Sequence, residues 1–236
     1  GKLTEEAFSA LWGLKRAGFA LVPITGRPAG WCDHIARFWP VDAVVGENGA
    51  FCGFMKDGRL RTIETPKGLN HEDSKQKLTA LWARIQTEFP GAQVASDQAF
   101  RRWDLAVDIC EDVSPWSAKD VERLLAVAQD EGAHAKVSSI HVNLWFGEYN
   151  KSTGFRHWMS EGCPGLRHPI ALERWAFIGD SPNDEPSFEL FPVSAGVSNL
   201  KKYLKQLKTR PTLLLTRPSG AGFAEFAKKL RRARRA

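Results

Sequence analysis

Hydrophobic and polar positions follow two different patterns along the chain. The first pattern combines amphipathic helical stretches with short apolar runs, such as residues 19–24, 42–45 and 175–178. Short apolar runs are typical of parallel strands that are buried on both faces. This pattern occupies residues 1–66 and 148–236, which we interpret as two parts of one α/β core with a Rossmann-like parallel sheet.

The section between them, residues 67–147, has a different pattern. Apolar residues alternate with polar ones around 103–109 and again around 140–146, as in strands with one apolar and one polar face. Each of these segments follows a stretch with helical spacing. We therefore predict an α+β cap domain, inserted into the core at residues 67–147.

Capping residues and turns indicate where several elements begin and end. Thr4 is suited to cap a first helix, and residues 117–120 resemble a capping box at the start of a later one. Asp57-Gly58 between apolar flanks predicts a β-hairpin. Pro23 counts against a regular central strand in the run 19–24, because it cannot donate to a hydrogen-bond ladder.

Composition excludes several classes of protein. Of the 236 residues, 43% are hydrophobic and 25% charged, which rules out intrinsic disorder and a small disulfide scaffold. No apolar run approaches the roughly 18 residues of a membrane helix. No apolar signal segment follows Gly1, and we expect a cytoplasmic protein whose natural start lies upstream. The scattered cysteines fit a reducing compartment and small buried side chains; they are Cys32, Cys52, Cys110 and Cys163.

The positive charge is concentrated at the C-terminal end. The chain has 33 Lys and Arg against 27 Asp and Glu, a net charge of +6. The last eleven residues account for this excess through Lys228, Lys229, Arg231, Arg232, Arg234 and Arg235. We interpret them as a solvated helix end, where cations suit the helix dipole. The alternative, a nucleic-acid arm, has few aromatic side chains to stack on bases, so we expect neither nucleic acid nor a membrane as partner.

Three polar clusters follow predicted strands or begin a predicted helix. Residues 25–27 offer a hydroxyl and backbone N–H groups to a phosphate, and Lys151 places a cation at a helix N-terminus. Asp180, Asn183 and Asp184 offer hard oxygen ligands suited to Mg²⁺. Alone, each cluster is also a common turn, solvated lysine or capped loop. Their order around an insertion predicts one phosphate site with a metal.

With these residues in this order, the chain resembles hydrolases of the haloacid dehalogenase (HAD) superfamily with the large IIB-type cap. This branch includes Cof-like, sucrose-phosphatase-like and mannosyl-3-phosphoglycerate-phosphatase-like proteins. The matching stretches are 24–27, 46–50, Lys151 and 177–184.

The resemblance implies a role for each cluster. Thr25, with Gly26 and Arg27, is implied in binding the transferring phosphoryl group, and Lys151 in stabilising its charge. Asp180 is implied as a direct Mg²⁺ ligand, with Asn183 and Asp184 organising the metal waters and the loop. Glu47 and Asn48 match a loop that lies near the active-site mouth in the family.

One motif of the family is absent. These enzymes carry an Asp-x-Asp on the first central strand, whose first Asp is the nucleophile and second the general acid/base. The chain contains no Asp-x-Asp. We expect the nucleophile to lie upstream of Gly1, on a strand between those that lead to Thr25 and Asp180. The alternative is a non-catalytic descendant that still binds phosphate and Mg²⁺.

The polar side of the cap strands offers candidates for substrate selection. Arg102, Asp104, His141 and Asn143 lie on this side of the pattern. If this side covers the active site, they bind sugar hydroxyls or a second acidic group; a solvent-facing sheet is the other interpretation. A lone His is more often a hydrogen-bonded structural residue than a ligand. The leading hypothesis is a Mg²⁺-dependent phosphomonoesterase for a small sugar phosphate or related organic phosphate. The rival is a silent phosphate-ligand-binding protein.

Overall fold

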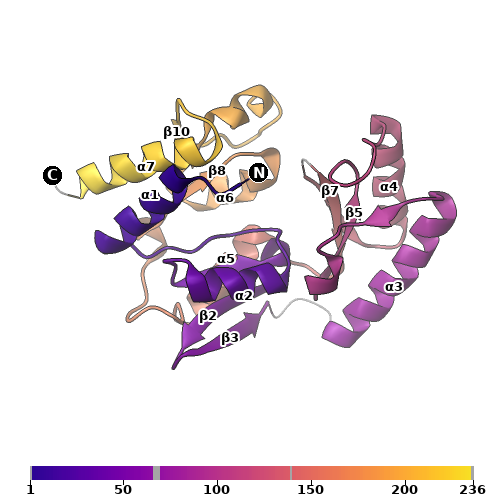
Figure 1. The fold of residues 1–236 in the computed structure, drawn as a ribbon, viewed down its shortest axis with the longest axis horizontal. Helices are drawn as coiled ribbons and strands as arrows, with labels where there is room; N and C mark the ends of the chain where they lie inside the picture. The colour runs from indigo at the N-terminus through magenta and orange to yellow at the C-terminus, as the bar shows by residue number, and fades with distance from the viewer. Residues whose placement is uncertain (1, 66–69, 139, 235–236) are drawn as a thin grey trace.

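The chain folds into a core and a cap that stand side by side (Figure 1). The computed structural model describes residues 2–65, 70–138 and 140–234. Its helices are α1 (Glu5–Arg16), α2 (Ala29–Phe38), α3 (His71–Glu88), α4 (Ala118–Asp130), α5 (Lys151–Ser160), α6 (Glu185–Leu190) and α7 (Ser219–Ala233). Its strands are β1 (Ala43–Gly46), β2 (Phe51–Lys56), β3 (Arg59–Glu64), β4 (Gln93–Val94), β5 (Asp104–Asp108), β6 (His134–Val137), β7 (His141–Trp145), β8 (Ala176–Gly179), β9 (Val193–Gly196) and β10 (Leu213–Leu214).

The core contains two three-stranded sheets. One is the antiparallel series β1-β2-β3, in which Asp57 and Gly58 form the predicted turn with positive φ angles of 52° and 70°. The other is the parallel series β10-β9-β8. The prediction of an α/β fold with a parallel sheet and helices is confirmed.

The apolar run 19–24 extends the first sheet without forming a regular strand. A single parallel bridge joins Ile24 to Val45, and the carbonyls of Leu21 and Pro23 accept hydrogen bonds from Asp42 and Val45. Pro23 has no N–H, which fits the irregular pairing. The run therefore forms the outer edge of the β1-β2-β3 sheet among the described residues.

A cavity of about 1040 Å³ separates this edge from β8. It is lined by residues 18–26 on one side and 174–180 on the other, and by apolar side chains of α1 and α7. All four residues of β8 are only half-buried, although strands of a parallel sheet are normally buried on both faces. The two core sheets therefore present facing edges to one groove, which we call the inter-sheet groove.

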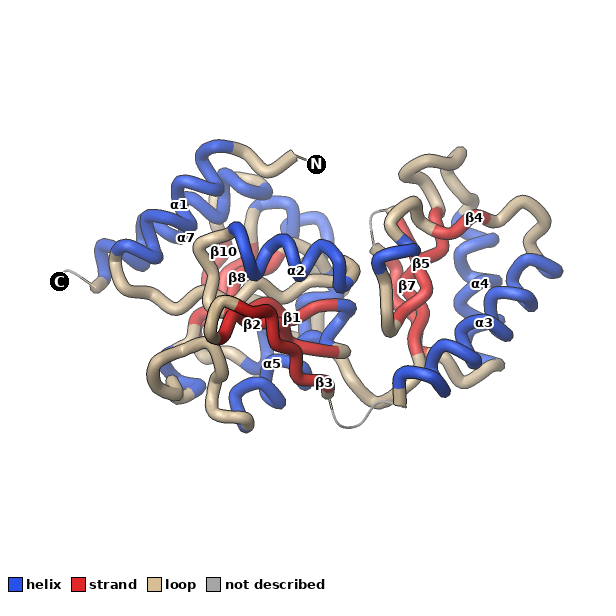
Figure 2. Tube along the Cα trace, turned by 60° about the horizontal axis from the view of Figure 1, so that its bottom comes forward, coloured by secondary structure: helices blue, strands red, loops and turns tan. Residues whose placement is uncertain are grey.

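The cap contains a four-stranded antiparallel sheet in the order β4-β5-β7-β6, packed on α3 and α4 (Figure 2). Its apolar cluster comes from these elements and the residues that flank them, and includes Leu81, Ile85, Leu124, Val142 and Leu144. On the polar side, Asp104, Asp108, His141 and Asn143 are also buried. The interpretation of this side as solvent-facing is therefore wrong. The boundary predicted at residue 67 lies outside the described residues, and the exact domain limits stay a prediction.

The two ends of the chain meet on the core. Helices α1 and α7 lie side by side (Figure 1), and the guanidinium of Arg234 lies 4.9 Å from the ring centroid of Phe19. The described basic side chains at the end of α7 are exposed, as predicted for a solvated helix end, while Arg235 lies outside the described residues. Three of the cysteines, Cys32, Cys52 and Cys163, are buried. Among the described residues, no helix has the length and apolar character to cross a membrane.

Candidate active site

The Thr25–Arg27 loop is held by its own hydroxyl and by the loop that follows β1. The Thr25 hydroxyl oxygen accepts a hydrogen bond from the N–H of Arg27 at 3.0 Å. The carbonyl of Thr25 accepts from the N–H of Asn48 at 3.1 Å, and that of Arg27 from Glu47 at 3.2 Å. These bonds fix the backbone of the loop at the end of the 19–24 segment.

The start of α5 packs closely against the loop that follows β1, because Gly49 and Gly154 leave room for the contact. A Cβ on Gly49 would lie 2.0 Å from the carbonyl oxygen of Asn150, and one on Gly154 would lie 2.6 Å from Gly49. Gly49 also has a φ of +107°, which disfavours any side chain. Asn150 caps α5 with a capping box, its side chain accepting from the N–H groups of Ser152 and Thr153. The close approach therefore brings the N-terminus of α5, with Lys151, to the centre of the core.

Lys151 contacts the acidic loop that follows β8. Its ammonium lies 2.8 Å from the Asp184 carboxylate and 3.4 Å from the Asn183 side-chain oxygen. The other oxygen of Asp184 accepts from the N–H of Asp180 at 2.9 Å. A Cβ on Gly179 would lie 2.5 Å from this carboxylate, so Gly179 leaves the room for it. The strand end, the loop and α5 are thus joined by a partly buried ion pair.

Asp180 directly follows β8 and lines the same cavity as Asp184. Burial raises the pKa of Asp180, and the neighbouring Asp184 raises it further, while Lys151 lowers it. A divalent cation relieves this repulsion between carboxylates. Mg²⁺ binds one or two carboxylates together with water and phosphate oxygens, so two carboxylates and an amide fit that donor set. Within the described ranges, no group of three or more His, Cys, Asp and Glu side chains gathers as a denser metal cluster.

The structure brings the three predicted clusters to one end of the inter-sheet groove. Thr25, Gly26, Lys151, Asp180 and Asp184 all line its cavity. Arg27 instead turns toward the cap, where its guanidinium lies 3.3 Å from Asp97. A phosphate role for these residues stays a prediction that this grouping supports.

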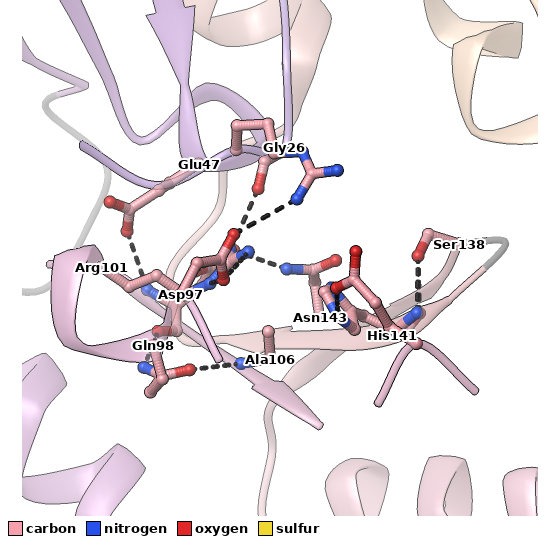
Figure 3. A network of polar contacts seen from close by, with 12 residues as sticks. Gly26, Glu47, Asp97, Gln98, Arg101, Ala106, Ser138, His141 and Asn143 are labelled. Carbon is pink, nitrogen blue, oxygen red and sulfur yellow. Dashed lines mark hydrogen bonds and ion pairs between the residues drawn. The ribbon is translucent and has the colours of Figure 1, made fainter. Parts of the chain in front are cut away.

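The loop after β1 lies between core and cap rather than at an open mouth (Figure 3). Glu47 is fully buried, and its carboxylate accepts from the N–H groups of Ala29, Arg102, Trp103 and Asp104 at 2.5–3.1 Å. Burial and the nearby Asp104 raise the pKa of Glu47 to about 7, against the N–H donors, which lower it. Asn48, at φ +57°, donates to the Asp104 carboxylate at 3.2 Å.

The cap candidates are occupied by bonds of their own. The side chain of Asn143 donates to Asp104 at 3.0 Å, and the His141 ring lies 2.9 Å from the Glu111 carboxylate. Arg102 is exposed, and its backbone N–H, not its side chain, reaches Glu47. A substrate role for these residues stays a prediction.

Sequence reasoning missed Arg101 and Asp97. The Arg101 side chain is only 1% exposed and binds Asp97, Asp104 and the carbonyl of Gly26. The period-two pattern placed Arg102 on the polar side of the strand, but β5 begins only at Asp104, so the pattern does not extend to residues 101 and 102. A pair of adjacent arginines next to an acidic strand start was the available signal.

Comparisons with known proteins agree with this architecture at the level of the fold. The sequence matches no protein-family model and no curated protein. Among solved structures, the sucrose-phosphatase from Synechocystis, in complex with sucrose and phosphate, is 17% identical with a TM-score of 0.65; the match covers 98% of this chain and 93% of that one. A HAD subclass IIB sugar phosphatase is 13% identical with a TM-score of 0.66, covering 97% and 92%.

A further solved structure extends the likeness to another phosphatase. The C-terminal domain of trehalose-6-phosphate phosphatase from C. albicans is 12% identical with a TM-score of 0.69, covering 97% of this chain and 83% of that one. At these identities the matches establish architecture rather than activity. The chain has the fold of HAD-superfamily phosphatases with a IIB-type cap, as the sequence motifs predicted.

Proposed function

We propose that the protein is a phosphomonoester hydrolase acting on a small sugar phosphate or related organic phosphate. The observation that carries the proposal is the end of the inter-sheet groove, where Thr25, Lys151, Asp180 and Asp184 line one cavity. A hydroxyl, an ammonium and two carboxylates at strand ends form the set that phosphoryl transfer needs. The solved structures with this fold include a HAD subclass IIB sugar phosphatase and a sucrose-phosphatase, which favours the same substrate class.

The proposed reaction uses a carboxylate nucleophile that residues 1–236 do not supply. An extended segment outside these residues enters the inter-sheet groove, pairs with the 19–24 edge and with β8, and carries an Asp-x-Asp to the Thr25 end. Two features of β8 support this placement: it is only half-buried, and no described strand pairs with its outer edge. Buried backbone groups require hydrogen-bond partners. The first Asp attacks phosphorus and the phosphorus–oxygen ester bond breaks. The second donates a proton to the leaving oxygen, and water then hydrolyses the aspartyl-phosphate.

This chain's own residues bind and orient the phosphate. Thr25 donates its hydroxyl and Gly26 its N–H to phosphate oxygens, while Lys151 neutralises the charge that develops on them. Asp184 holds the Lys151 ammonium in place at 2.8 Å. Asp180 and Asp184 would hold Mg²⁺, which adds positive charge next to the phosphate when it is bound.

The test is phosphate release by the product of the whole gene, including codons upstream of Gly1. We expect release from a panel of sugar phosphates, lost on Asp180→Asn and on chelation by EDTA. Release that survives both would overturn the metal role. Asp130→Asn, at an exposed cap position, is the matched control and should leave release unchanged.

A silent binding protein is the rival function, favoured by the absence of an Asp-x-Asp from residues 1–236. It predicts no turnover by the whole gene product, together with Mg²⁺-dependent thermal protection by sugar phosphates. Turnover above that of Lys151→Met would exclude it.

A further inference from the structure

The contact between cap and core is made in large part by buried charge. Three carboxylates and two guanidiniums meet there, from Glu47, Asp97, Asp104, Arg27 and Arg101. Side-chain exposure is 1% for Arg101 and 0% for Asp104. Buried ionic groups are unfavourable unless each finds partners. Here Arg101 pairs with Asp97 and Asp104 within the cap, while Glu47, Arg27 and the carbonyl of Gly26 supply partners from the core.

Glu47 makes the first set of bonds across this boundary. Its carboxylate joins the N-terminus of α2, through the N–H of Ala29, to the start of β5, through the N–H groups of residues 102–104. One core side chain thus satisfies three consecutive N–H groups of the cap. Movement of the cap away from the core would expose the N–H groups of residues 102–104 to water and break their bonds to Glu47.

Arg101 makes the second set, in the opposite direction. From the cap, it donates to the carbonyl of Gly26 at 3.0 Å and to Asp104 at 2.8 Å. Its remaining N–H groups bind Asp97 at 3.0–3.1 Å. Asp97 in turn lies 3.3 Å from Arg27. The Arg101 guanidinium therefore binds the same 25–27 loop that lines the candidate site.

We propose that Glu47 and Arg101 form a latch that holds the cap on the core and positions the Thr25–Arg27 loop in the closed state. Both are positioning residues, since their side-chain bonds go to protein groups. In the proposed function the substrate enters between core and cap, and the latch opens by exchanging its bonds for bonds to water. The loop then loses the Gly26 anchor at the same time as the cap lifts, which couples closure to phosphate binding. The coupling, though not the latch itself, rests on the proposed function.

Amide hydrogen exchange measures opening of the latch directly and does not depend on enzymatic activity. In Arg101→Lys, which keeps the charge but not the planar fork, we expect exchange at Arg102, Trp103 and Asp104 to rise about tenfold or more. Exchange at the N–H of Arg27, in the core loop, should rise as well. Amides of the β5–β7 ladder should not change. The adjacent Arg102→Lys is the matched control, since its side chain is exposed, and should change none of them.

Two outcomes would overturn the latch. One is unchanged exchange at residues 102–104 in Arg101→Lys; the other is an equal rise throughout the cap, which indicates plain destabilisation. If Arg101→Lys does not fold, Asp97→Asn is the second variant. It weakens only the contacts of Asp97 with Arg101 and Arg27, so the exchange rates at residues 102–104 should rise by a smaller factor. In the whole gene product, Arg101→Lys should lower kcat more than it changes KM. Absence of any turnover would count against the proposed function alone, because the exchange result stands without it.

Discussion

At the residue scale, Lys151 stabilises the acidic loop after β8. Its ammonium is paired with Asp184, whose side chain is only 6% exposed. Lys151→Met leaves that carboxylate buried beside Asp180, so we expect a loss of about 1–3 kcal/mol in the free energy of unfolding. Denaturant titration measures it. Arg156→Met removes the same charge from an exposed position of α5 and should cost less than about 0.5 kcal/mol. Equal losses in both variants would contradict the buried pair.

Glu47 predicts a pH dependence at the same scale. Its pKa is raised from 4.5 to about 7 by burial and by Asp104, with Arg101, Cys32 and Tyr149 as the other ionisable groups around it. The closed state binds the Glu47 proton more tightly than the open state does. Its extra stability relative to the open state is therefore fully present below about pH 4.5. It is lost as the pH rises through about 7.

The measurement is exchange at residues 102–104, corrected for the intrinsic dependence of exchange on pH. We expect the opening equilibrium to increase at least about tenfold between pH 5 and 8 in the natural sequence. In Glu47→Gln this increase should disappear. An opening equilibrium that stays constant between pH 5 and 8 would mean that the N–H donors outweigh burial and keep Glu47 ionised in the closed state.

At the scale of elements, α5 is positioned by backbone contact. A Cβ at Gly154 would lie 2.6 Å from the Cα and the carbonyl oxygen of Gly49, and neither atom belongs to a flexible side chain. Gly154→Ala should therefore destabilise the protein by about 1–3 kcal/mol. In α1, a Cβ at Gly13 would meet only the end of the Arg231 side chain, at 3.0 Å. Gly13→Ala should be neutral or stabilising by up to about 1 kcal/mol. Thermal unfolding of the two variants compares them, and a common sign would contradict the contact.

Local signals predicted the elements better than their contacts. The Thr4 and Ser117 caps accept from the N–H groups of Ala7 and Asp120, as their positions indicated. The turn at 57–58 also formed. These features depend on neighbouring residues, which the sequence displays directly. The role of Glu47 was not visible, because its partners lie 18 to 57 positions away in the chain.

The candidate site was predictable for a related reason. Thr25 follows the apolar run 19–24, Asp180 follows β8 and Lys151 begins α5. Parallel topology gathers such positions at one edge of a sheet. Arg101 escaped because its contacts depend on how the cap sits on the core. The pattern of polar and apolar residues within one strand does not indicate how the cap packs on the core.

At the scale of the whole molecule, charge is segregated more widely than in the last eleven residues. Residues 1–200 hold 21 basic and 26 acidic residues, a net charge of −5; residues 201–236 hold 12 and 1, a net charge of +11. All described basic side chains of this second segment are exposed. Most of this charge faces solvent, where it increases solubility and attracts anions.

The molecule also has separate apolar centres, which predicts separate local unfolding. The cap cluster around Leu144 and the core cluster around Leu200 share no residue. Both leucines are fully buried, so replacement by Ala should cost about 2–5 kcal/mol in each case. We expect Leu144→Ala to raise amide exchange in β5 and β7 while β8 and β9 keep their rates, and Leu200→Ala to do the reverse. Because the latch and a small apolar contact around Trp103 connect the two parts, exchange at residues 102–104 should rise in Leu144→Ala as well. A uniform rise across both sheets in either variant would show that cap and core unfold as one cooperative unit.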